Sequence, residues 1–204
     1  MTEWWTYRPS DLLMFSPRVY ARLIETVNEA VFPLQWIGAA AALGVLVLLL
    51  MRRDGWGARV ALPVLAVAWG SVALVFHARH FSTINTAAPV FAWAFAVQAL
   101  VFLVMTWWPR HLSWADVRGL RRWVALGLAL AALLFPLLAP LSGRPWAQAE
   151  VFGVQPDPTV LATLAVLLSL RAQPFATLLT WTMPLLWCVV AVLLQWTLHE
   201  AGGG

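Results

Sequence analysis

The chain has 204 residues, of which 62% are hydrophobic and 11% are charged, and its formal net charge is +4. Average globular proteins carry about 25% charged residues, and a soluble domain of this size leaves about 30% of its unfolded surface exposed to water. A soluble enzyme, a disordered chain and a nucleic-acid-binding domain are therefore disfavoured. The composition instead predicts an all-α bundle of membrane-spanning helices, whose first partner is the lipid bilayer and which binds no nucleic acid.

The first 30 residues are predicted to form an amphipathic interfacial arm and not a span. Ser16 and Pro17 indicate a helix start, because Ser caps helix N-termini and Pro suits the first helical position. Between Val19 and Val31, apolar residues recur at helical spacing while Arg and Glu occupy the other face. Such a helix is expected to lie in the membrane interface or to pack across the ends of the spanning helices.

Residues 31–199 are predicted to form a single transmembrane domain, and residues 200–204 a flexible tail. At ~1.5 Å per residue, about 20 apolar residues cross a hydrocarbon core of about 30 Å. Five uncharged runs are predicted to do so: residues 31–51, 60–76 with a continuation to Phe81 as an alternative, 87–108, 123–141 and 174–198.

A sixth uncharged run, residues 159–170, is much shorter than the others. Its 12 residues would make a helix of about 18 Å. We expect a short or tilted full span, because hydrophobic mismatch costs only fractions of a kcal/mol per Å. This gives six spans, and five spans with a re-entrant segment are the alternative.

The arginines predict an orientation in a bacterial cytoplasmic membrane. Counted in chain order, with residues 159–170 as the fifth span, the loops after the first, third and fifth spans hold eight Arg, whereas the loops after the second and fourth hold two. The positive-inside rule then places the odd-numbered loops in the cytoplasm and both termini outside.

The segment from Gln155 to Thr159, Gln-Pro-Asp-Pro-Thr, is the most specific local pattern. Asp157 fits the cap of a helix and Pro158 its first position. A helix N-terminus carries about half a positive charge, so one that starts below the membrane interface could bind an anion or a polar substrate group. A capped helix end without a ligand is the alternative.

Two histidines, His77 and His80, lie in a polar loop predicted at residues 77–86. On a helix they would share a face, and Glu150 or Asp157 could supply a third metal ligand. A divalent cation, zinc first, is the cofactor that such a set would hold. Two interfacial histidines without a metal are the alternative.

No charged residue lies in the middle of a predicted span, so a membrane-embedded proton relay is not expected. The sequence also lacks a phosphate-binding loop, a dinucleotide fingerprint, a zincin motif and a nucleophile elbow. Its one cysteine, Cys188, allows no internal disulfide. An enzyme is therefore the less favoured interpretation.

Several stretches spread over nearly the whole chain form a set. They are Trp4-Trp5-Thr6-Tyr7 with Phe15-Ser16-Pro17, Asn28-Glu29-Ala30 with Pro33 and Gln35, Ile84-Asn85-Thr86-Ala87-Ala88 with Gln98, the stretch from Phe152 to Thr159, and Pro184 with Trp187. This set resembles an uncharacterised family of bacterial integral membrane proteins, catalogued as domain of unknown function 6064. The resemblance implies a small all-helical membrane protein and no established activity. In the family pattern Cys often stands between the two prolines where this chain has Asp157, so a thiol-based role is not expected.

The polar residues of these stretches suggest a binding site. Asn28, Asn85 and Asp157 are predicted on the same side of the membrane, and with Gln155 and Thr159 they form the expected polar pocket. The first functional expectation is a permease for a small solute or ion, or an accessory subunit of one. One alternative is a structural subunit of a larger membrane complex, with a membrane-protein partner or a second copy of the chain. The other is a membrane enzyme acting on a lipid or isoprenoid.

Overall fold

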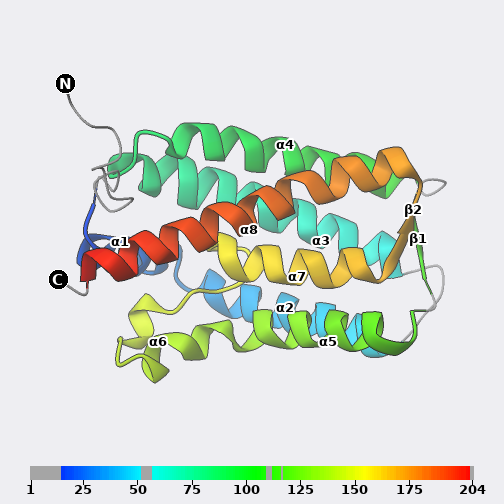
Figure 1. Ribbon diagram of the computed structural model, residues 1–204, viewed down its shortest axis with the longest axis horizontal. Helices are drawn as coiled ribbons and strands as arrows, with labels where there is room; N and C mark the ends of the chain where they lie inside the picture. Colours follow the sequence, from blue (N-terminus) through cyan, green and yellow to red (C-terminus); the bar gives the residue numbers. More distant parts are fainter. Residues whose placement is uncertain (1–14, 52–56, 109–111, 116, 203–204) are drawn as a thin grey trace.

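The computed structural model describes residues 15–51, 57–108, 112–115 and 117–202, and most of them are helical (Figure 1). Five helices are long and apolar enough to cross a membrane, by length and composition. They are α2 (Leu34–Met51), α3 (Gly57–Ser71) with its continuation to Thr83, α4 (Ala88–Trp107), α5 (Gly119–Leu134) with its continuation to Leu141, and α8 (Pro174–Gly202). The predicted all-α bundle with five long apolar helices is confirmed.

Helix α3 continues past Ser71 as a π-helix, η3 (Val72–His80), and a 3-10 turn, η4 (Phe81–Thr83). The polar loop predicted at residues 77–86 is therefore wrong over its first seven residues, and the alternative, a continuation of the second run to Phe81, is the one observed. The polar side chains of this stretch suggest a loop, but Phe76 and Phe81 are buried in the core. Their packing extends the helix, because tertiary packing contributes more to helix stability than local preference does.

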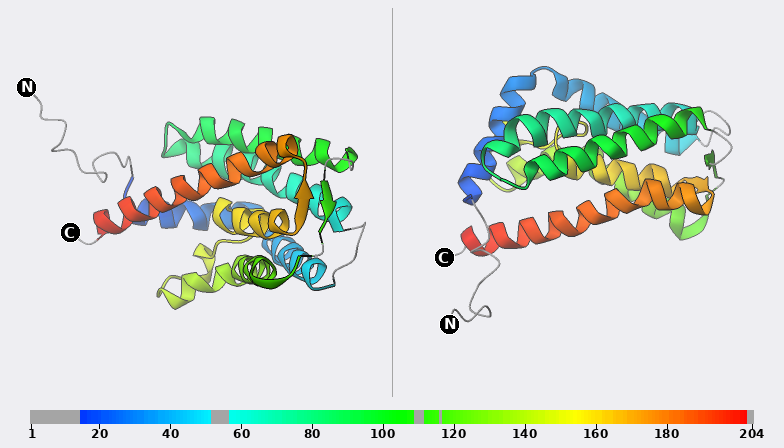
Figure 2. Two further views of the ribbon diagram at one scale, coloured as in Figure 1. Left: turned by 45° about the vertical axis from the view of Figure 1, so that its right-hand side comes forward. Right: turned by 90° about the horizontal axis from the view of Figure 1, so that it is seen from above.

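The bundle has two ends, which we name the α1 end and the hairpin end. At the hairpin end two short strands, β1 (Leu112–Trp114) and β2 (Leu170–Ala172), pair antiparallel with Ser113 opposite Arg171. At the other end lie α1 (Pro17–Val31) and the last turns of α8 (Figure 2). Both ends of the described chain thus lie at the α1 end, while their orientation in a membrane stays a prediction.

Helix α1 is amphipathic and begins where the sequence indicates. The Ser16 hydroxyl accepts a hydrogen bond from the Val19 backbone N–H at 3.4 Å, and Pro17 is the first helical residue. The apolar face of α1 packs against η3, α8 and the 3-10 turn η6 (Trp146–Gln148) through Tyr20, Leu23, Ile24 and Val27. The arm therefore packs across the ends of the spanning helices, and residues 1–14 lie outside the described part of the chain.

The short uncharged run predicted at residues 159–170 belongs to a segment that we name the sixth crossing, in which a non-helical stretch precedes a short helix. After α5 the chain continues through η5 (Phe135–Leu137) and α6 (Leu138–Leu141) to η6, which packs on α1. Residues 149–155, which we name the extended segment, then run into the bundle, and α7 (Pro156–Leu168) carries the chain on to β2 (Figure 1). The chain thus passes from one end of the bundle to the other, as a full crossing and not as a re-entrant segment.

Helix α7 is enclosed by the rest of the bundle. Its 13 residues make about 20 Å, too little to cross a membrane without the extended segment. Its neighbours are α2, α3, α5 and α8. The residue that caps α7 is Gln155, with Pro156 in first position and Asp157 in the first turn, so the prediction that Asp157 is the cap is wrong by two residues. The backbone of Gln155 is extended and its amide is bonded to the preceding loop, which places the cap there.

Two glycines permit the path of the extended segment. A Cβ at Gly38 of α2 would collide with the carbonyl oxygen of Phe152. Gly153 has a φ of 75°, a left-handed conformation that favours glycine, and its N–H donates to the Thr159 hydroxyl at 2.8 Å. The segment therefore lies directly against α2 and turns sharply before α7 begins.

Candidate functional site

The extended segment is held in the bundle by side chains that hydrogen-bond its backbone. Asn28 of α1 donates through Nδ2 to the carbonyl oxygens of Ala147 and Ala149, both at 2.8 Å. The Gln155 Oε1 accepts from the Val151 N–H at 2.7 Å. Buried backbone groups need hydrogen bonds, and in a helix the backbone itself supplies them. In the extended segment the side-chain amides of Asn28 and Gln155 take this role.

A chain of buried polar side chains, which we name the polar column, follows from Asn28 along α7. The Gln155 Nε2 donates to Asn28 Oδ1 at 2.9 Å. The Thr159 hydroxyl donates to the Gln155 carbonyl at 2.7 Å, and the Thr163 hydroxyl donates to the Thr159 carbonyl at 2.7 Å. Trp69 of α3 closes the column, because its indole N–H donates to the Thr163 hydroxyl at 2.8 Å.

Three of the five residues predicted for a polar pocket meet in this column: Asn28, Gln155 and Thr159. Asn28 is 7% exposed and the other two are 0% exposed, so they form a hydrogen-bonded cluster and not an open pocket. The sequence analysis missed Thr163 and Trp69 as members. The spacing of four residues between Thr159 and Thr163 was the available signal, because it places both on one face of a helix.

Asp157 lies outside the polar column and links α7 to α8. Its Oδ1 accepts from the Trp187 indole N–H at 2.9 Å, and Gln195 of α8 also hydrogen-bonds this carboxylate. Trp187 in turn contacts the ring of His77 nearly edge-on, with the ring centroids 5.1 Å apart. The role of Asp157 in the described residues is therefore to connect two helices through a buried aromatic group.

Glu150 lies where the chain enters the bundle, and we name Glu150 and Asp157 the acidic pair. It interacts electrostatically with Asp157 and with Arg144. The residue is 5% exposed, and its Oε2 has no hydrogen-bond partner in the described part of the chain. The entrance thus holds a buried carboxyl group that interacts with a second carboxyl group.

Tyr20 of α1 shares the surroundings of the acidic pair. Burial raises the pKa of its hydroxyl well above the usual value, and the charges of Glu150 and Asp157 raise it further. The positive charge of Arg144 acts in the opposite direction. A phenol, two carboxyl groups and one guanidinium therefore influence one another at the α1 end.

His77 is fully buried in a box of aromatic rings. Their centroids lie 4.6 to 5.9 Å from that of the imidazole, and they belong to Phe76, Phe81, Phe91, Phe95 and Trp187. Neither ring nitrogen has a hydrogen-bond partner among the residues that the structure describes. The imidazole therefore serves the core as a packed ring.

The residues predicted to bind a metal do not come together. His80 is half-buried, and its Nδ1 donates to the Val75 carbonyl at 2.8 Å. Because a π-helix has a wider turn than an α-helix, residues three apart do not share a face, so His80 is directed away from the box around His77. Within residues 15–51, 57–108, 112–115 and 117–202, no group of three or more His, Cys, Asp or Glu could hold a metal ion. Within these residues His77, His80 and Glu150 therefore do not form a metal site.

Asn85 does not join the polar column either. Its Oδ1 accepts from the Ala87 N–H at 2.8 Å, in the turn that leads into α4. This is a local Asx-type contact that shapes a turn. The prediction that Asn85 shares a pocket with Asn28 is therefore not supported by its contacts.

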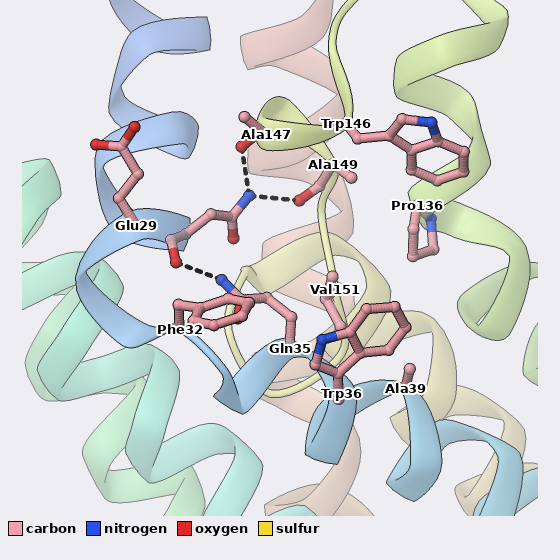
Figure 3. A pocket seen from close by; sticks show the side chains of 11 residues that line it. Glu29, Phe32, Gln35, Trp36, Ala39, Pro136, Trp146, Ala147, Ala149 and Val151 are labelled. Carbon is pink, nitrogen blue, oxygen red and sulfur yellow. Dashed lines mark hydrogen bonds between the residues drawn. The ribbon is translucent and has the colours of Figure 1, made fainter.

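Two apolar grooves flank the extended segment. The larger, the α1–α2 groove, has a volume of about 670 Å³ and lies between the end of α1, the start of α2, Pro136 and residues 146–151 (Figure 3). The smaller, of about 420 Å³, lies between α2, α3 and residues 152–154. The extended segment is thus accessible from two sides to an apolar molecule.

The profile of one protein family, described as a Family of unknown function (DUF6064), matches residues 18–200. The match covers well over half of the chain and confirms the resemblance seen in the sequence. No curated protein and no solved structure matches the chain. The comparisons therefore supply a family without an activity.

Proposed function

Because the chain belongs to this family of unknown function, we propose its function from the geometry: it is a permease for a small solute or ion, with the sixth crossing as its route. The observation that carries the proposal is the broken crossing, in which residues 149–155 are not helical and α7 begins inside the bundle. Non-helical backbone at membrane depth is tolerated only where protein buries it or where it lines a cavity. Transporters place such broken helices at their substrate sites.

The polar column supplies this route with hydrogen-bonding groups in an otherwise apolar bundle. Gln155, Thr159 and Thr163 are each 0% exposed and bonded to one another. A typical hydrogen bond contributes only about 0.5–1.5 kcal/mol net, so amide and hydroxyl groups can exchange partners with a polar solute at small cost. The column therefore supports a solute that both donates and accepts hydrogen bonds.

The acidic pair supports a cationic or neutral solute over an anion. Two carboxyl groups near the entrance produce a negative potential whenever either is ionised. Asp157 lies in the first turn of α7, so its carboxylate already compensates the partial positive charge of that helix N-terminus. The anion site expected from the sequence is therefore not part of this proposal.

Cysteine accessibility tests whether the column opens to water. In a Cys188→Ser background, Thr163→Cys places a thiol in the column and Ala129→Cys places one in the apolar core, at residues that are 0% and 1% exposed. A membrane-impermeant thiol reagent applied to proteoliposomes is expected to modify the first variant and to leave the second unmodified. Equal protection of both thiols contradicts the proposed route.

Flux measurements test transport itself with probes of known chemistry. Proteoliposomes are assayed for proton, sodium and potassium entry with entrapped indicators, and for glycerol entry by light scattering. We expect at least one probe to enter faster than into protein-free vesicles, and Glu150→Gln to lower the flux of a cationic probe about fivefold or more. Glu200→Gln, an exposed site at the same end, is the matched control. If all four probes enter at the rate of empty vesicles, the permease proposal is wrong.

A further inference from the structure

We propose that the α1–α2 groove binds one phosphatidylethanolamine molecule, with the ammonium group at Glu29 and an acyl chain along the apolar wall. The proposal does not depend on the permease proposal, because the lipid would lie in the outer groove, which shares only Asn28 with the polar column. It assigns a lipid of defined headgroup chemistry to a defined surface of the bundle.

The position and size of the groove fit a bilayer lipid. Its volume of about 670 Å³ lies within the range of about 300–1,000 Å³ that is typical of small-molecule sites. Three aromatic side chains of its lining face outward: Phe32 and Trp36 are each 72% exposed, and Trp146 is 61% exposed. Exposed tryptophans are typical of the membrane interface, so the groove opens at the depth where headgroups meet acyl chains.

The wall of the groove is apolar and accepts an acyl chain. It is formed by Phe32, Trp36, Ala39, Pro136 and Val151. Acyl chains are as apolar as these side chains, so the wall by itself gives no preference among lipids. Any selectivity must therefore come from the polar end of the groove.

The polar end presents one negative charge. Figure 3 shows Glu29 at one end of the groove and Trp36 with Ala39 at the other. Glu29 is exposed, and it is the one charged side chain in the described lining. The Gln35 amide, which Figure 3 shows beside Phe32 and away from Glu29, donates through Nε2 to the Asn28 carbonyl. The charge of Glu29 is therefore the feature that distinguishes headgroups at this end.

An ethanolamine headgroup supplies what this end lacks. A primary ammonium carries one positive charge and three N–H donors, which match the carboxylate of Glu29. A choline headgroup carries the same charge without an N–H donor. A phosphatidylglycerol molecule brings hydroxyl donors but a net negative charge next to Glu29. The groove is therefore expected to retain phosphatidylethanolamine best, then phosphatidylcholine, then phosphatidylglycerol.

Native mass spectrometry of the full-length chain in a lipid-exchanging detergent tests this order. Dioleoyl forms of the three lipids compete at equal concentration, so that only the headgroup differs. We expect one phosphatidylethanolamine per chain, retained about fivefold better than phosphatidylglycerol. Glu29→Gln should reduce that preference to about twofold or less, and Glu200→Gln, an exposed glutamate outside the groove, should leave it unchanged.

A second variant tests whether the lipid binds in the α1–α2 groove. Ala39→Trp fills the apolar wall, so it should remove the bound lipid while the helical circular dichroism is retained. Equal retention of the three lipids overturns the proposal. So does a phosphatidylethanolamine preference that survives both Glu29→Gln and Ala39→Trp, because the lipid then binds elsewhere. A co-purifying protein lost from Ala39→Trp, with no lipid bound, would assign the groove to a protein partner instead.

Discussion

Glu150 and Gln155 are buried polar side chains five residues apart in the sequence, and they differ in how their polar atoms are satisfied. Gln155 uses both ends of its amide, toward Val151 and Asn28. Glu150 keeps Oε2 without a partner in the described part of the chain. A fully bonded amide fixes the local structure, and a carboxyl oxygen without a partner does not. We therefore expect the stability of the fold to depend on Gln155.

Gln155 is expected to be far less replaceable than Gln98. Both are buried amides, 0% and 3% exposed, but the only partner found for Gln98 in the described residues is a weak contact to the Thr180 carbonyl at 3.5 Å. Gln155→Leu leaves the Val151 N–H and the Asn28 carbonyl oxygen Oδ1 without partners, so we expect a loss of about 2–4 kcal/mol. Gln98→Leu should change stability by less than about 1 kcal/mol. Denaturant unfolding of the two variants side by side measures the difference, and equal losses would contradict the role assigned to Gln155.

The sequence predicted part of this residue-scale picture. The Gln-Pro-Asp-Pro-Thr pattern drew attention to Gln155, Asp157 and Thr159, because caps and turns use a small set of residues. It could not separate Thr159, which joins the polar column, from Asp157, which bonds Trp187. That distinction depends on which neighbouring helix each side chain contacts, and the spacing of residues within the pattern does not reveal it.

At the scale of elements, α2 and the extended segment depend on a close approach at Gly38. A Cβ there would collide with the Phe152 carbonyl oxygen, whereas a Cβ at Gly44 of the same helix would meet nothing within 4 Å. A backbone atom cannot move aside as a flexible side chain can. A side chain at Gly38 is therefore expected to disturb the path of the extended segment, whereas a side chain at Gly44 is not.

Alanine substitutions at the two glycines measure this directly. Gly38→Ala is expected to destabilise the protein by about 1–3 kcal/mol, because the collision forces a backbone shift. Gly44→Ala should be neutral or stabilising by up to about 1 kcal/mol, because alanine is the better helix former. Thermal unfolding of both variants provides the comparison. If Gly38→Ala is as stable as Gly44→Ala, the extended segment does not lie against α2 in solution.

Element boundaries were predictable where apolar residues decide them. The long apolar runs became α2, α4, α5 and α8 within a few residues, since hydropathy and helix length are local properties. The continuation of α3 through His77 was predicted only as an alternative, because polar side chains there suggest a loop while His77 lies against aromatic rings of other helices. The helix is extended by contacts that a single stretch of sequence cannot reveal.

At the scale of the whole molecule, the two ends of the bundle carry different charges. The hairpin end holds Arg59, Arg118, Arg121, Arg122 and Arg171, and Arg121 donates to the Leu168 and Leu170 carbonyls at 2.6 and 2.9 Å after α7. The α1 end mixes Arg with Glu25, Glu29 and Glu150. The positive-inside rule therefore predicts that the hairpin end faces the cytoplasm.

Thiol labelling in intact cells tests this orientation. In a Cys188→Ser background, Glu200→Cys exposes a thiol at the α1 end and Arg171→Cys exposes one at the hairpin end. A membrane-impermeant maleimide is expected to label the first in intact cells and the second only after lysis. The reverse pattern would show the opposite orientation, and labelling of both in intact cells would argue against a spanning bundle.

The sequence by itself determined the class of protein, the five long apolar helices, the amphipathic arm with its Ser16 cap and the family. Each follows from composition, period or a short motif, which are properties of neighbouring residues. Only the tertiary structure decided that the sixth crossing is partly non-helical, that the polar column includes Trp69, and that His77 is buried while His80 bonds the Val75 carbonyl. The physical reason is distance along the chain: the bond between Asn28 and Gln155 joins residues 127 positions apart, and only packing brings such groups together.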